Sequence, residues 1–155
     1  MTTQTYAPVT TAVTVDLPPA AAFELFTTGI DKWWPRSHHI GATELSRAVL
    51  EPRSGGRWYE VGADGTECEW GHVLAWEPPR RLVLAWAINS DWQHDPDLVT
   101  EVELIFEPRD GGTLVSLEHR NLERFGDRAA DMRQAFESGG GWPGLLGAFA
   151  DAAGA

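Results

Sequence analysis

The sequence is poor in cysteine and in basic residues. Cys68 is the single cysteine among 155 residues, so the chain cannot form an internal disulfide and fits a reducing compartment. There are 12 lysines and arginines against 23 aspartates and glutamates, which gives a net charge of −11. A chain this acidic repels nucleic-acid phosphates and anionic lipid surfaces. We therefore expect neither a nucleic-acid partner nor a membrane partner.

Long hydrophobic runs are also missing. No apolar stretch approaches the roughly 20 residues that are needed to span a bilayer. Residues 1–11 contain neither a basic segment nor the hydrophobic centre of a secretion signal. We predict a cytoplasmic protein in which residues 1–155 form one domain, long enough to bury a sizeable core.

Signatures of catalysis and metal binding are absent as well. The chain has no CxxC or HxxxH spacing and no GxSxG turn. The neighbouring His38 and His39 would point apart on an extended chain, and a site formed by Cys68, His72 and Glu60 has no supporting spacing. We predict no metal, no cofactor and no dedicated catalytic residue.

Tryptophan, by contrast, is abundant, with eight in the chain. Each brings a large apolar surface and an N–H group that needs a partner when it is buried. Two explanations stay open. The rings either fill the interior completely, or several of them line a cavity that accepts an apolar ligand.

The hydrophobic pattern changes from strand to helix and back to strand. Residues 9–15 alternate as a strand, residues 18–26 continue as a helix with two prolines in its first turn, and residues 31–35 form a second short helix. Strand patterns then follow at 43–51, 57–61, 66–76, 81–88, 98–106 and 113–119. An antiparallel sheet with its helices on one side is an α+β fold.

The C-terminal segment, residues 127–153, keeps helical periodicity and forms the element on which the sheet packs. Three consecutive glycines, 139–141, interrupt it and are followed by Pro143. Glycine weakens a helix interior, and proline cannot donate to the preceding turn. The sequence therefore predicts either a kink here or a fresh helix with Pro143 in its first turn.

Alternation along each strand assigns side chains to the two faces of the sheet. The glutamates of residues 98–119 mark the solvent face, so Phe106 and His119 point toward the C-terminal helix, as Trp86 does on the preceding strand. For residues 66–76 we take the tryptophan side as inward, which places His72 inside too.

Several short motifs occur in a familiar order. They are residues 13–18 leading into 22–26, 33–35, 54–58, 71–74, 78–82 with Trp86, 100–106, 111–113, and 141–142 with Leu145 and Phe149. In this order the chain resembles the helix-grip superfamily of pollen allergens, START lipid-transfer domains and polyketide cyclases. Within it, the chain is similar to the branch named for the activator of Hsp90 ATPase (AHSA1-like). The resemblance implies a curved seven-stranded antiparallel sheet wrapped around a long C-terminal helix, with a cavity between them. It carries no shared catalytic triad, and a fold of this kind does not fix a function.

We predict that the cavity binds a small hydrophobic or aromatic molecule, because aromatic residues from separate elements would meet around one space. The expected ligand-binding residues are Trp33, Trp34, Trp58, Trp70, Trp86, Phe106, His119, Phe136, Trp142 and Phe149. In this interpretation Trp33 and Trp34 form part of the entrance, and His119 or His72 gives the polar contact.

Two alternatives remain beside this binding function. The same cavity could serve a cyclase or hydrolase, although the residues favour a binding protein over an enzyme. The family name suggests a co-chaperone module, which the acidic surface could serve, but a lone domain with no second module weighs against a chaperone partner. The edge strands would allow a homodimer.

Overall fold

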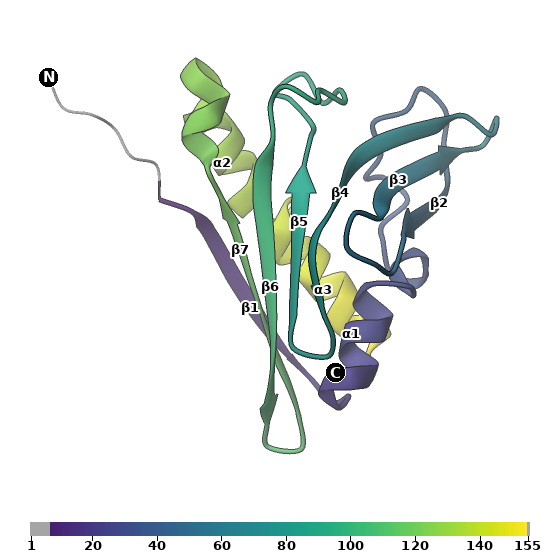
Figure 1. The fold of residues 1–155 in the computed structure, drawn as a ribbon, viewed down its shortest axis with the longest axis vertical. Helices are drawn as coiled ribbons and strands as arrows, with labels where there is room; N and C mark the ends of the chain where they lie inside the picture. The colour runs from purple at the N-terminus through teal and green to yellow at the C-terminus, as the bar shows by residue number, and fades with distance from the viewer. Residues whose placement is uncertain (1–6, 155) are drawn as a thin grey trace, which may run out of the picture.

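The computed structural model describes residues 7–154, which form an antiparallel sheet with helices packed on its concave side (Figure 1). The first six residues, where the sequence predicts no secretion signal, lie outside the described residues. The strands are β1 (Val9–Val15), β2 (Leu45–Leu50), β3 (Arg57–Gly62), β4 (Glu67–Glu77), β5 (Arg81–Trp86), β6 (Thr100–Arg109) and β7 (Gly112–Arg120). Their order across the sheet is β1-β7-β6-β5-β4-β3-β2. Strands β2 to β7 therefore form a meander, and β1 pairs with β7, the last strand of the chain. This is the predicted helix-grip architecture.

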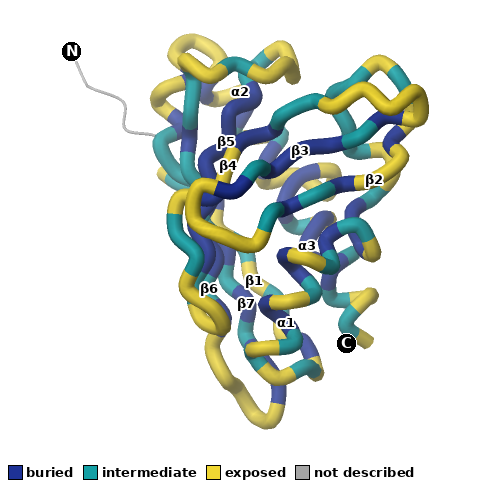
Figure 2. The backbone as a smooth tube through the Cα atoms, turned by 45° about the vertical axis from the view of Figure 1, so that its right-hand side comes forward, coloured by how far each residue is buried: buried dark blue, intermediate teal, exposed yellow. Residues whose placement is uncertain are grey.

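Five helical segments within residues 7–154 complete the fold. They are α1 (Pro19–Phe26), the 3₁₀ turns η1 (Ile30–Lys32) and η2 (Leu122–Arg128), and the C-terminal helices α2 (Ala129–Glu137) and α3 (Trp142–Ala152). The buried residues lie between these helices and the sheet, while the hairpin turns are exposed (Figure 2). The two short helices predicted after β1 are α1 and η1.

The C-terminal helical segment is interrupted at residues 138–141, as the glycines and Pro143 predict. Ser138 has an extended backbone, with φ −77° and ψ 171°, and Pro143 lies in the first turn of α3. A Cβ atom on Gly141 would lie 2.3 Å from the carbonyl oxygens of both Ala135 and Phe136. Only glycine fits this close approach. Of the two predicted outcomes, the structure shows a fresh helix with Pro143 in its first turn.

Two irregularities in β4 correct the predicted faces of that strand. Trp58 pairs with Gly71 while Tyr59 pairs with Glu69, so one residue, Trp70, is extra on β4. A second register shift, between Val73 and Ala75, restores the original alternation further along the strand. Such bulges turn the intervening side chains over.

The prediction that His72 points inward is therefore wrong. His72 is exposed, and Leu74 is 40% exposed, whereas Val73 between them is buried. On β5, β6 and β7 no such shift occurs, and the predicted inward residues Trp86, Phe106 and His119 are all buried.

Candidate ligand-binding cavity

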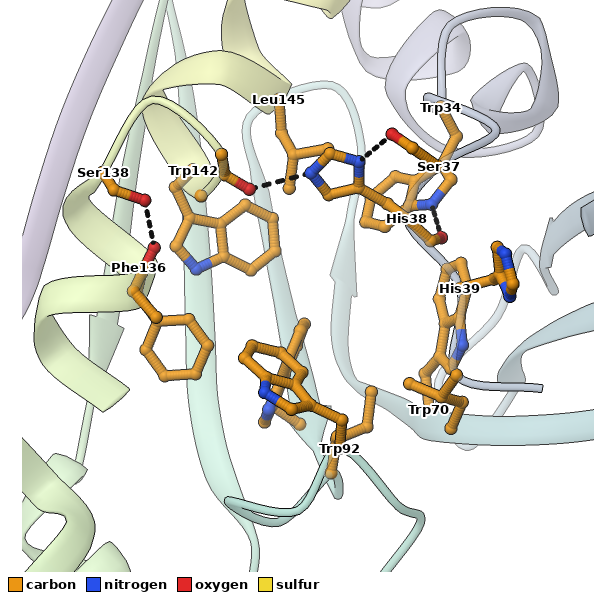
Figure 3. A pocket seen from close by; sticks show the side chains of 16 residues that line it. Trp34, Ser37, His38, His39, Trp70, Trp92, Phe136, Ser138, Trp142 and Leu145 are labelled. Atoms are coloured by element: carbon orange, nitrogen blue, oxygen red, sulfur yellow. Dashed lines mark hydrogen bonds between the residues drawn. The ribbon is translucent and has the colours of Figure 1, made fainter. Parts of the chain in front are cut away.

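A cavity of about 300 Å³ lies between the sheet and the interruption of the C-terminal helix (Figure 3). Strands β4 and β5 supply one wall through Trp70 and Trp86. The opposite wall comes from the end of α2 and the start of α3, and the segment of residues 34–40 closes a third side. The helix break is thus part of the cavity wall.

Aromatic rings dominate the lining. Five predicted residues contribute: Trp34, Trp70, Trp86, Phe136 and Trp142. Ring centroids are 4.8 Å apart for Trp34 and Trp70, and 5.6 Å apart for Trp86 and Trp142. The Trp86 ring also meets Phe136 edge-on at 5.4 Å. Because each ring is held by its neighbours, the wall is stiff and presents both ring faces and ring edges to the space.

Three of the other predicted residues lie in the core, away from the cavity. Trp33, Phe106 and Phe149 pack around Phe26 of α1, with ring centroids 5.0, 6.1 and 5.4 Å from it. The Trp33 indole N–H donates to the Leu25 carbonyl at 2.9 Å, which fixes the ring against α1. The expected entrance role of Trp33 therefore does not fit its position, because the side chain is bonded inward.

Trp58 is also outside the cavity lining and packs behind Trp70 and Trp86. Its ring is 5.5 Å from Trp70 and 5.7 Å from Trp86, edge-on to both. The indole N–H groups of Trp58 and Trp86 have no hydrogen-bond partner among the described residues. Edge-to-face packing lets a ring edge meet the π face of a neighbour, which compensates such donors in part. Gly71 pairs with both Trp58 and Trp86, and a Cβ atom there would clash with the Ala85 carbonyl of the neighbouring strand.

His119 supports the cavity wall from behind. It is completely buried, its Nδ1 accepts from the Trp142 indole N–H at 3.0 Å, and its Nε2 lies 2.7 Å from the Thr100 hydroxyl. Burial lowers the pKa of His119 to about 3, so the ring is neutral. His119 does not line the cavity. The side chain predicted to contact the ligand instead holds Trp142 in place.

Three of the four serine and histidine side chains that line the cavity come from the loop of residues 37–39, which the sequence did not predict as part of the site. Ser37, His38 and His39 all line the space, and His38 reaches across to the helix break. Its Nε2 lies 2.8 Å from the Gly140 carbonyl oxygen, and its Nδ1 lies 3.1 Å from the Ser37 hydroxyl (Figure 3). The Trp34 indole N–H donates to the His38 carbonyl at 2.8 Å. The paired histidines were the available signal, but only the folded topology brings residue 38 beside residue 140.

Glu60 of β3 holds the end of the loop of residues 37–41 against the sheet. The carboxylate is fully buried and accepts from the backbone N–H groups of Ile40 at 2.6 Å and Gly41 at 3.1 Å. It also accepts from the Trp70 indole N–H at 2.8 Å. One side chain on β3 therefore joins the loop to the sheet wall, and charge-assisted bonds of this kind are among the stronger ones.

Trp92 forms an outer part of the lining that the sequence analysis also missed. It projects from the loop between β5 and β6, is 44% exposed and has a positive φ of 59°. Its ring lies 6.2 Å from Phe136. An exposed tryptophan beside an aromatic cavity is positioned to cover an occupant.

Within residues 7–154 no group of three or more histidine, cysteine, aspartate or glutamate side chains is arranged to hold a metal ion. In the same part of the chain, no helix has the length and hydrophobicity that crossing a bilayer would require. The chemistry that this cavity offers is aromatic contact, together with hydrogen bonding from Ser37, His38 and His39.

Comparison with solved structures finds several folds of this kind. The anthrahydroquino-γ-pyrone synthase Txn09 is 38% identical, with a TM-score of 0.67 over 96% of this chain and 97% of that one. CalC, a self-sacrificing resistance protein from Micromonospora echinospora, is 30% identical, with a TM-score of 0.71 over 95% and 94% of the two chains. The Aha1 dimer from Colwellia psychrerythraea, at 17% identity and a TM-score of 0.63 over 95% and 96% of the two chains, shares the fold.

No curated protein matches the chain. The family described as "Activator of Hsp90 ATPase homolog 1-like protein" matches residues 16–153, nearly the whole length. The match agrees with the sheet order, the packing of the C-terminal helices and the resemblance that the sequence motifs carry. The chain belongs to the Activator of Hsp90 ATPase homolog 1-like family.

Proposed function

We propose that the protein binds a small planar aromatic molecule between β4–β5 and the α2–α3 break. The observation that carries this proposal is the lining: rings from six separate segments surround one cavity, and three of its four serine and histidine side chains lie on the loop of residues 37–39. Pockets for small molecules have this composition, with apolar walls and a few polar groups that fix orientation.

The size of the cavity narrows the ligand class. A volume of about 300 Å³ is at the lower end of the range of roughly 300–1,000 Å³ found for ligand sites. It suits a few fused rings rather than a lipid with long chains. A hydroxyl or carbonyl substituent on the rings would find Ser37 and His39 at the loop side.

The similar proteins support an aromatic ligand. The name of Txn09 describes a synthase for an anthrahydroquinone fused to a γ-pyrone, and its identity of 38% extends over nearly all of both chains. We infer from this that a hydroxylated fused-ring compound is the ligand class to test first.

The test is a fluorescence titration with 1,8-dihydroxyanthraquinone, following quenching of the tryptophans. Trp92→Ala removes an exposed lining ring, and we expect about two- to twelvefold weaker binding, because an aromatic pair contributes roughly 0.5–1.5 kcal/mol beyond its buried area. Leu74→Ala is the matched control, since Leu74 is similarly exposed (40% against 44%) but lies outside the cavity lining. Ala135→Phe, which fills the cavity from α2, should abolish binding.

Saturable quenching that Ala135→Phe removes and Leu74→Ala leaves intact would support the proposal. Equal affinity of the wild type and Ala135→Phe would contradict it, because the ligand would then bind elsewhere. Native mass spectrometry of the purified protein gives an independent readout, since a bound compound adds mass that is lost on denaturation.

A second candidate is a ring-forming enzyme that uses the same cavity. The identity to Txn09, named as a synthase, is the observation that favours it. The two candidates separate by product analysis: a binding protein returns an aromatic ligand unchanged, whereas an enzyme converts an uncyclised polyketide precursor to a fused-ring product.

A further inference from the structure

Ser37, His38 and the Gly140 carbonyl form a connected polar chain at the edge of the aromatic cavity (Figure 3). The Ser37 hydroxyl is exposed, so a molecule in the cavity can reach it. His38 lies between the two other groups, with one ring nitrogen directed at each. The function proposed above uses Ser37 only as a hydrogen-bonding group and makes no use of its link to His38 and Gly140.

The bond to Gly140 decides which nitrogen of His38 carries the proton. A carbonyl oxygen can only accept, so Nε2, at 2.8 Å, must be the donor. In the neutral imidazole Nδ1 then has a free lone pair, and this atom lies 3.1 Å from the Ser37 oxygen. The Ser37 hydroxyl therefore donates to His38.

These are the three roles of an activated nucleophile. Ser37 is the hydroxyl, His38 the base within hydrogen-bond reach, and the Gly140 carbonyl the group that orients the base. The same roles recur in unrelated proteins and are recognised by geometry rather than by sequence position. A carbonyl orients the ring as a carboxylate would, without adding a charge.

We propose that Ser37 and His38 form an acyl-transfer site that hydrolyses esters of aromatic alcohols. Ser37 Oγ attacks the ester carbonyl carbon while His38 Nδ1 takes the hydroxyl proton. The bond from carbon to the aryl oxygen breaks, and His38 returns the proton to the departing aryl oxide. Water then attacks the acyl-Ser37 carbon, gives its proton to His38, and the carboxylic acid leaves as Ser37 regains a hydrogen.

The aromatic lining selects the alcohol part of the ester. A fused-ring aryl group would lie against Trp34 and Trp142, which places an ester on its edge near Ser37. This placement rests on the proposed aromatic binding. The loop is fixed from below by Glu60, so the nucleophile is presented by a supported segment rather than by a free one.

The chain offers matched controls for a test with 2-naphthyl acetate. Ser54 is exposed, and its hydroxyl donates to the Leu74 carbonyl at 3.4 Å, outside the cavity lining. His72 is exposed on β4 and also lies outside the lining. Ser54→Ala and His72→Gln thus remove the same residue types without altering the cavity.

We expect Ser37→Ala and His38→Gln to lower the enzyme-dependent release of 2-naphthol by about 100-fold or more, the lower range of general-base contributions. Ser54→Ala and His72→Gln should stay within about twofold of the wild type on the same scale. Peptide mass spectrometry after a short reaction should locate one acetyl group on Ser37.

The proposal is overturned if the wild type releases no naphthol above the buffer rate, if Ser37→Ala keeps the wild-type rate, or if the acetyl group lies on Cys68. Titration of each variant with 1,8-dihydroxyanthraquinone separates the two proposals. If the wild type binds the anthraquinone but releases no naphthol, only the acyl-transfer proposal is refuted. If the wild type shows neither binding nor turnover, the aromatic-binding function is refuted as well.

Discussion

The buried His119 should make the stability of the protein depend strongly on pH. Its pKa is about 3 in the folded chain, lowered from 6.5 by burial. The hydrogen bond from the Trp142 indole N–H gives a geometric reason for the low pKa as well, because Nδ1 of His119 must stay unprotonated to accept it. In the unfolded chain His119 regains its ordinary pKa. Below pH 6.5 the unfolded state therefore binds a proton that the folded state does not bind, and this favours unfolding.

The direction and the size of this pH dependence follow from the folded and unfolded pKa values of His119. A group whose pKa is depressed on folding contributes stability above its unfolded pKa and loses it as the pH falls toward the folded value. From pH 7 to pH 5, His119 alone should lower the free energy of unfolding by about 2 kcal/mol, since each pH unit corresponds to roughly 1.4 kcal/mol. The loss should continue until the pH approaches 3.

The assay is urea unfolding at pH 7 and pH 5, followed by tryptophan fluorescence, for the wild type and for His119→Gln. Glutamine does not titrate in this range, and its amide can still pair with Thr100 or Trp142. Carboxylates are common to both proteins, so their contributions cancel in the difference between the two pH dependences. His72→Gln, which removes an exposed histidine, is the control variant. Identical slopes for the wild type and His119→Gln would refute the reasoning.

Three further predictions concern the segments that frame the cavity. Glu60→Gln should destabilise the protein by about 1–3 kcal/mol in urea unfolding, because one amide oxygen cannot accept from all three N–H groups that now donate to the carboxylate; an unchanged midpoint would mean that the loop is held by other contacts. Gly141→Ala should cost about 1–3 kcal/mol, because its Cβ would press on two carbonyl oxygens. Gly140→Ala, whose Cβ would meet only the Ser138 hydroxyl at 3.9 Å, should fold normally and slow the exchange of 1,8-dihydroxyanthraquinone in stopped-flow fluorescence; unchanged on- and off-rates would show that the joint does not move during binding.

The sequence predicts the fold well where local rules decide the structure. Alternation predicted all seven strands, and the glycines with Pro143 predicted the break between α2 and α3. The bulges of β4 could not be predicted, because an extra residue on one strand is defined only by its pairing with neighbouring strands. That is why His72 was assigned to the wrong face.

The cavity was predicted only in part, for a similar reason. Residues on β4, β5 and the C-terminal segment have a periodicity that gives their direction, and Trp70, Trp86, Phe136 and Trp142 line the cavity. Loop residues have no period. The position of His38 depends on a contact with a residue 102 positions away, which no local pattern encodes.

The break between α2 and α3 also has a consequence for how the cavity edge can change by mutation. In an unbroken helix the carbonyl of residue 140 would accept from the amide four residues further on, and it would not be available to a side chain. Here it is free to accept from His38. Because the acceptor is a main-chain atom, no single codon change can delete it. A mutation can alter what reaches this oxygen, but the cavity keeps one fixed polar point as long as the helix stays broken.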